Sequence, residues 1–326
     1  MKRRKKISKK SKILDRKLVF SIVIIAIVVG GLVCYTVFLQ NSPEIKFSLR
    51  AAIVDQLGND IPNFEFNSTV ADLLVRGGFP ATGIFYHRSE DITVDFYGGL
   101  ANYNYGIIIL RAHSALREGQ TTVDLFTSEN YTDALANEYR SKYGSRLLVK
   151  GEYLWHPGEF YFAITSDFIA SLNGYFPKSI IIAMGCWSIR PSEPGWRWMA
   201  EAFIEKGAKA YIGWTDIVYP QDTDNETVNL LNMLLIENEP LGDAISKTRS
   251  YQTQFENQTF TTHLDFYPKS GPNSAVNLTI SDLMKDVKPS QTLQSIANNF
   301  KLFSPLSFIA NVINYKSKDF AVCQEN

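Results

Sequence analysis

An uncharged apolar run of 22 residues near the N-terminus, Leu18–Leu39, is the feature that most constrains how this chain can fold. A helix of that length crosses the hydrocarbon core of a bilayer. A buried core helix is rarely so uniformly apolar, and a cleaved signal peptide has a shorter apolar region followed by a cleavage site between small residues. The residues after Leu39 offer no such site. The sequence therefore predicts an uncleaved transmembrane anchor at 18–39.

The segment before this run sets the predicted orientation. Residues 2–17 carry ten Lys or Arg residues and a single acid, Asp15. Because positively charged flanks stay on the cytoplasmic side, we expect residues 1–17 to form a basic cytoplasmic N-terminus. We therefore predict a single-pass protein of the cell membrane whose C-terminal domain is extracytoplasmic.

The remainder of the chain is acidic. Of the 33 basic and 33 acidic residues, 23 basic and 32 acidic ones lie beyond residue 17, a net charge of about −9. Such a body argues against a nucleic-acid partner. A hydrophobic content of 45% and a charged content of 20% are typical of a folded domain. We expect a polar spacer at 40–48, an α/β domain at 49–285 and a C-terminal appendage at 286–326.

Two further counts bear on the compartment. Three cysteines are too few for a disulfide scaffold, although a bridge between Cys186 and Cys323 stays open. The sequence also holds five N-x-S/T sequons, a number that fits a glycosylated extracytoplasmic domain. The sequons start at Asn67, Asn130, Asn225, Asn257 and Asn277.

Apolar strands alternate with helical segments over most of the predicted domain. Continuous Ile and Leu runs indicate strands that are covered on both faces, so we predict an α/β fold with an open, mainly parallel, doubly wound sheet. The region 115–160 is less regular, with short strands predicted around a helix at 131–142. The main predicted strands are 50–57, 81–86, 105–111, 160–164, 179–184 and 209–213. The main predicted helices are 68–77, 93–101, 166–173, 195–206, 225–238 and 241–252.

Two reactive residues follow two of these predicted strands. His113 comes two residues after Arg111, and Cys186 comes two residues after Met184. Catalytic groups of a doubly wound sheet gather beyond the carboxyl ends of its strands, so both side chains are expected on one rim. A nucleophilic thiol needs a partner that moves its proton, and imidazole titrates near neutral pH. The alternative is a buried cysteine acting as a small hydrophobe beside an ordinary polar histidine.

An apolar block followed by His and Ser, and later an apolar block followed by Gly and Cys, resembles the caspase-like (clan CD) cysteine peptidases. That clan includes caspases, clostripain, legumain, separase and gingipains, together with their CHAT-domain relatives. The resemblance covers about residues 50–255, and AEAFIEKGAKAYIGW after the cysteine is most similar to gingipain-like and CHAT-domain sequences.

The resemblance implies a caspase-like fold and a cysteine peptidase that acts on peptide or protein substrates. We expect no cofactor and assign no metal-ligating residues. Cys186 would be the nucleophile and His113 the general acid and base, with backbone N–H groups at Cys186 and near Ser114 stabilising the oxyanion. The family more often has Gly in place of Ser114 and Ala in place of Gly185. The caspase motif Q-A-C-R-G is absent, so cleavage after Asp is not implied.

Three more residues are expected on the same rim. Trp214 and Asp216 follow the next strand, and Asp216 is a candidate for recognising a basic side chain, an ordinary loop carboxylate being the alternative. Trp187 is a candidate wall of a substrate groove. Anchor, sequons and domain together are typical of an archaeal surface protein. A catalytically inactive caspase-like binding or scaffold module is the alternative function, and the oligomeric state stays open.

Overall fold

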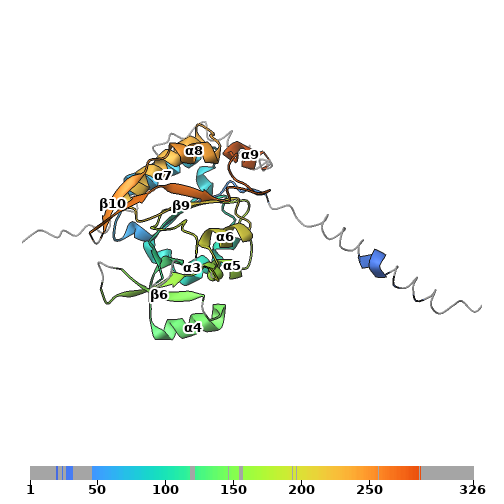
Figure 1. Ribbon diagram of the computed structural model, residues 1–326, viewed down its shortest axis with the longest axis horizontal. Coiled ribbons are helices and arrows are strands. Elements are labelled where there is room, and N and C mark those ends of the chain that lie inside the picture. Colours follow the sequence, from blue (N-terminus) through green and yellow to red (C-terminus); the bar gives the residue numbers. More distant parts are fainter. Residues whose placement is uncertain are drawn as a thin grey trace, which may run out of the picture. The chain divides into compact units, whose positions relative to one another are not determined.

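The computed structural model divides the chain into two units, 1–45 and 46–326, and Figure 1 shows its elements. The described residues are 20, 24, 27–31, 46–117, 122–145, 147–153, 157–192, 194–195, 197–255, 257–285 and 287.

Most of the predicted anchor at 18–39 lies outside the described residues. Those of its residues that are described, 20, 24 and 27–31, are helical. Within the described part of the chain, no helix has both the length and the apolar character needed to span a bilayer. The predicted appendage 286–326, apart from residue 287, also lies outside the described residues.

A largely parallel six-stranded sheet forms the centre of the second unit, which confirms the predicted α/β fold. Its strand order is β12-β9-β8-β3-β1-β2. Neighbouring strands from β2 to β9 run parallel, and only the edge strand β12 pairs antiparallel, with β9. The strands are β1 (Ala51–Asp55), β2 (Ile84–His87), β3 (Ile107–Arg111), β8 (Ile180–Ala183), β9 (Ala210–Trp214) and β12 (Leu264–Tyr267).

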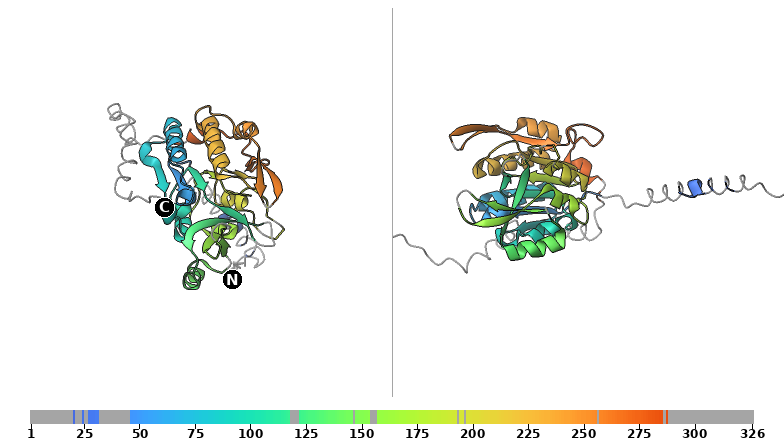
Figure 2. Two further views of the ribbon diagram at one scale, coloured as in Figure 1. Left: turned by 90° about the vertical axis from the view of Figure 1, so that its left-hand side faces the viewer. Right: turned by 60° about the horizontal axis from the view of Figure 1, so that its bottom comes forward.

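Helices cover both faces of this sheet, as Figures 1 and 2 show. In β3, Ile107 and Ile109 enter one apolar core while Ile108 and Leu110 enter the other. This explains why the strand reads as a continuous apolar run instead of an alternating one. The first core is closed by α2 (Phe64–Arg76), α7 (Pro220–Leu235), α8 (Leu241–Lys247) and α9 (Ile280–Met284). The second is closed by α3 (Val94–Gly99), α4 (Asp133–Tyr143), α5 (Ser166–Ser171) and α6 (Met199–Glu205).

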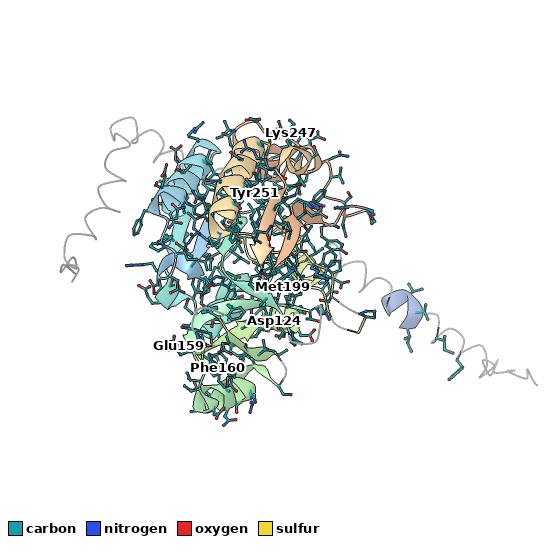
Figure 3. The ribbon with its side chains drawn as sticks, turned by 60° about the vertical axis from the view of Figure 1, so that its left-hand side comes forward. Asp124, Glu159, Phe160, Met199, Lys247 and Tyr251 are labelled. Atoms are coloured by element: carbon teal, nitrogen blue, oxygen red, sulfur yellow. The ribbon has the colours of Figure 1, made fainter. Side chains whose placement is uncertain are left out.

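A second, antiparallel sheet corrects the prediction of a single sheet. Its order is β4-β5-β7-β6, and its members lie between β3 and β8 in the chain. Asp124 of β5 and Phe160 of β7 are labelled in Figure 3. The apolar run 160–164 thus pairs here and not in the parallel sheet. The strands are β4 (Ser114–Leu116), β5 (Val123–Asn130), β6 (Leu148–Glu152) and β7 (Phe160–Ile164).

Four predicted helices have boundaries that differ from the structure by more than two residues. Helix α2 begins at Phe64, because the Asn63 side chain accepts a hydrogen bond from the Phe66 N–H and caps the helix there. Helix α6 begins only at Met199. Helix α7, predicted at 225–238, begins at Pro220 and ends at Leu235. The predicted helix 241–252 ends at Lys247. It is followed by a hairpin of β10 (Tyr251–Phe255) and β11 (Gln258–Thr262).

Candidate functional site

The register between β3 and β8 places His113 and Cys186 at equivalent positions. Leu110 lies opposite Ala183 in this parallel pair, and the Met184 N–H donates to the Leu110 carbonyl at 2.9 Å. Each candidate residue lies three positions beyond its strand's member of that pair. Two neighbouring strands therefore deliver the histidine and the cysteine to the same rim of the sheet, as the sequence predicts.

The two segments beyond these strands are in direct contact. The Ser114 hydroxyl donates a hydrogen bond of 2.5 Å to the Cys186 carbonyl. A Cβ atom added to Gly185 would lie 2.6 Å from the Ala112 carbonyl oxygen and 2.8 Å from the Ser114 nitrogen. Real Cβ atoms do not approach that closely, so the rim requires glycine at position 185. Glycine at this position, where the caspase-like peptidases that the sequence resembles more often have Ala, thus has a steric reason.

His113 is held through its backbone and packed through its ring. Its N–H donates to Gln56 Oε1 at 3.0 Å, and its carbonyl accepts from the Phe126 N–H at 3.0 Å. The ring lies 5.0 Å from the Tyr153 ring, centroid to centroid. Burial, together with the positive charge of Arg111, lowers the pKa of His113 to about 4. The imidazole is therefore neutral at neutral pH.

Cys186 carries a free, partly buried thiol. Its Sγ lies 3.7 Å from the Val218 carbonyl oxygen, to which the thiol donates. Burial raises the pKa of this thiol above its ordinary value, and the negative charge of Asp216 raises it further. With its pKa raised, the thiol is protonated at neutral pH. No hydrogen bond joins the described side chains of Cys186 and His113.

A buried ion network surrounds Arg111, two residues before His113. The fully buried Arg111 guanidinium donates from Nη1 to Asp55 at 2.7 Å. It donates from Nε and Nη2 to the two oxygens of Asp224 at 2.8 and 2.9 Å. Asp55 ends β1 and Asp224 belongs to α7, so the network joins the ends of β1 and β3 to a helix. Buried charges are tolerated when they are paired and hydrogen-bonded in this way.

The two carboxylates also bind neutral groups. Asp55 Oδ2 accepts from the Tyr86 hydroxyl and from Asn67 Nδ2, each at 2.9 Å. Asp224 Oδ2 accepts from Asn63 Nδ2 at 2.9 Å. Asn63 therefore both caps α2 and positions Asp224.

The other predicted rim residues fall into two groups. Trp214 is fully buried, and its Nε1 donates to Thr223 at 2.7 Å, so its ring belongs to the core and not to an open groove. Asp216 and Trp187 do lie by the cysteine, since the Trp187 N–H donates to the Asp216 carbonyl at 3.2 Å. Asp216 Oδ1 accepts from the Ile217 N–H at 2.8 Å. Trp187 has a left-handed backbone with φ 53°, a conformation that costs energy in a bulky residue.

Several site residues have little sequence signal. Asp55 is the last residue of β1 and falls inside the predicted strand 50–57, so the rule that found His113 beyond a strand end does not single it out. Gln56 and Tyr153 come from segments with no catalytic pattern, and Asp224 lies within a helix. Among the described residues, no group of three or more His, Cys, Asp or Glu side chains is arranged to hold a metal ion.

The chain was also compared with known proteins. No protein-family model matches it, and a search of the curated proteins finds no match. The caspase-like resemblance therefore stays a prediction from the sequence.

Proposed function

We propose that this protein is a membrane-anchored, extracytoplasmic cysteine peptidase, with a caspase-like fold, that cleaves peptide bonds through Cys186 and His113. The observation that carries the proposal is the pairing of Leu110 with Ala183 in adjacent parallel strands. It supports a shared rim for the two reactive residues, and the contact between Ser114 and Cys186 supports a fixed geometry for the segments that hold them.

The protonation states of the two side chains before reaction favour general-base activation of the thiol by His113. A neutral His113 and a protonated Cys186 form a neutral pair, not a thiolate and an imidazolium. In the proposed reaction, His113 takes the thiol proton as Sγ attacks the scissile carbonyl and forms a tetrahedral intermediate. His113 then gives that proton to the leaving amine, and water activated by His113 hydrolyses the thioester.

The oxyanion is stabilised by backbone N–H groups at Cys186 and near Ser114, in this proposal. The Ser114 hydroxyl holds the Cys186 carbonyl, and Gly185 allows the two segments to approach. Donors that are already oriented stabilise developing charge without reorganisation. The left-handed backbone of Trp187, next to the nucleophile, is the kind of local strain that proteins retain at functional sites.

Asp216 is the proposed recognition group for a basic substrate side chain. Its negative charge acts on Cys186, and its backbone contacts Trp187, so it lies close to the reacting bond. Substituting Asp216 with Asn should reduce kcat/KM for substrates with Lys or Arg at the cleavage site more than for substrates with neutral side chains.

The proposed location rests on the basic segment 1–17 and the apolar run 18–39. Carbonate extraction of membranes tests the anchor, because a transmembrane protein stays in the pellet. Protease treatment of intact cells tests the orientation. Release of the chain by carbonate, or full protection from external protease, would contradict this part of the proposal.

Activity is tested with the full-length protein in mild detergent and reductant, on a diverse peptide library. We expect cleavage by the parent and loss of cleavage in Cys186→Ala and in His113→Ala. Ser68→Ala, on the exposed surface of α2, serves as a conservative control outside the dyad. Turnover that survives in Cys186→Ala would contradict the proposed nucleophile.

The second candidate is a catalytically inactive binding or scaffold module at the cell surface. The raised pKa of the Cys186 thiol and the missing hydrogen bond to His113 favour it. It predicts peptide binding without turnover and a Cys186 that reacts no faster than a buried thiol.

A further inference from the structure

A pocket of about 330 Å³ lies beside the loop that follows Cys186. Arg190 and Trp198 line it from that loop, and Phe266 and Tyr267 line it from the edge strand β12. Thr215, just beyond the end of β9, forms part of its wall on the side of the rim. The pocket thus combines the cationic side chain of Arg190 with aromatic walls.

Arg190 supplies the uncompensated charge. Its guanidinium has no hydrogen-bond or ion-pair partner within the described part of the chain. The other two charged residues of the pocket neutralise each other, because Lys269 Nζ lies 2.6 Å from Asp265 Oδ1. Asp265 Oδ1 also accepts from the Phe266 N–H at 2.8 Å. The pocket therefore carries a net positive charge from Arg190.

Trp198 supplies a donor without an acceptor. Its Nε1 is buried and makes no hydrogen bond to the described residues. Its ring is held against the Tyr267 ring, with the centroids 4.6 Å apart. A buried N–H without an acceptor is unfavourable, and a ligand oxygen would remove that cost.

The pocket is within reach of the nucleophile. Arg190 follows Cys186 by four residues, and its N–H donates to the Trp187 carbonyl at 2.8 Å, which folds the loop back. The Ile189 N–H donates to the Trp214 carbonyl at 3.2 Å, which fixes this loop beside β9. Four extended residues span at most about 14 Å, so a peptide with its scissile bond at Cys186 reaches the pocket within about four residues.

We infer that this pocket, named here the Arg190 pocket, binds the carboxylate of an Asp or Glu side chain of the peptide substrate. Arg190 contributes an ion pair and Trp198 a hydrogen bond, while the aromatic walls contact the methylene groups of the bound side chain. The inference rests on the proposed peptidase function, because the pocket acts as a specificity site beside the reacting bond.

Binding is measured first, so that the pocket can be judged apart from catalysis. The probe is a library of N-acetylated hexapeptides in matched pairs, with Glu or Gln at one position, bound to the full-length Cys186→Ala protein. When the varied residue is the one that enters the pocket, we expect the Glu peptide of that pair to bind about tenfold more tightly than its Gln partner. Arg190→Gln should abolish that ratio, and Trp198→Phe should reduce it while keeping the ring.

Arg249→Gln is the matched control. Arg249 also has no ion-pair partner among the described residues, but it lines a different pocket, together with Glu226 and Lys247. This variant should keep the ratio. The backbone N–H of Arg190, not its side chain, makes the loop contact, so Arg190→Gln should keep the fold. Thermal unfolding of each variant checks this.

Each outcome separates the two proposals. A Glu preference that depends on Arg190, without turnover by the parent, would support the pocket and contradict the peptidase. Cleavage without any acidic preference would contradict the pocket and leave the peptidase standing. An acidic preference that survives in Arg190→Gln, or no binding by any peptide, would overturn the assignment of this pocket.

Discussion

At the scale of single residues, burial acts on both halves of the proposed dyad. It lowers the pKa of His113 and raises the pKa of Cys186, so each side chain is neutral at neutral pH. Arg111 adds to the first effect and Asp216 to the second. The protonation states of this pair are thus set first by burial and then by charged neighbours, neither of which the His and Cys patterns alone reveal.

The Cys186 thiol should behave as a buried thiol toward an alkylating reagent. Because only the thiolate reacts, the rate with iodoacetamide should rise about tenfold per pH unit through pH 9, without a plateau at neutral pH. Asp216→Asn should speed the reaction at pH 8, since it removes a charge that raises the thiol pKa. Peptide mapping by mass spectrometry isolates this cysteine. A plateau near pH 7 would instead indicate a stabilised thiolate.

His113 should make stability depend on pH. Its pKa is about 4 in the folded protein and about 6.5 in an unfolded chain, so between these values the unfolded chain binds the extra proton. The free energy of unfolding therefore falls as the pH is lowered from 7 to 4, by about 3 kcal/mol from this residue. Denaturant unfolding of the parent and of His113→Gln at several pH values between 4 and 7 measures this fall in the free energy of unfolding. Identical pH profiles for the two proteins would contradict the buried, neutral imidazole.

At the scale of elements, the site depends on how strand ends are joined. The network of Arg111, Asp55 and Asp224 fixes β1 and β3 against α7, and Asn63 links α2 to the same network. The apolar runs predict these strands well, because each buries both faces. Hydrogen-bond partners 56 to 161 residues apart carry no local signal, which is why Asp224 and Asn63 were not predicted.

The start of α2 provides a test of this connection. Asn63→Ala removes the cap of the helix and the hydrogen bond to Asp224, so it should lower the free energy of unfolding by at least about 1 kcal/mol. Ser68, the first residue of the predicted helix 68–77, bonds the Glu65 carbonyl on the surface, and Ser68→Ala should have little effect. Chemical denaturation compares the two. An equal loss in both variants would contradict the observed cap.

At the scale of the whole molecule, residues 46–326 form a unit with its own core. Both apolar clusters of the central sheet are built from this unit alone. We therefore expect a fragment of residues 46–326 to unfold cooperatively at the same temperature as that unit in the full-length protein. Circular dichroism during heating measures both. A fragment without a cooperative transition would show that the domain needs residues before 46.

The five sequons differ in how accessible their asparagine side chains are in the folded molecule. Asn67 uses Nδ2, the atom that would carry a glycan, to donate to Asp55 and Tyr86. The other four asparagines, Asn130, Asn225, Asn257 and Asn277, are exposed. If the domain is glycosylated, we expect occupied sites among these four and an unmodified Asn67. Glycopeptide mapping of protein from its native membrane tests this, and a glycan on Asn67 would contradict the folded arrangement.

The sequence by itself determined the alternation of strands and helices and the two strand ends that carry His113 and Cys186. These features follow from local patterns, since a strand buried on both faces must be apolar throughout. Only the tertiary structure decided that 160–164 joins a separate antiparallel sheet and that Trp214 is a core residue. It also decided that Arg190 lines a pocket in which its guanidinium has no ion-pair partner among the described residues. The physical reason is that strand pairing, burial and ion pairing join residues distant in the chain, and a local pattern does not specify those partners.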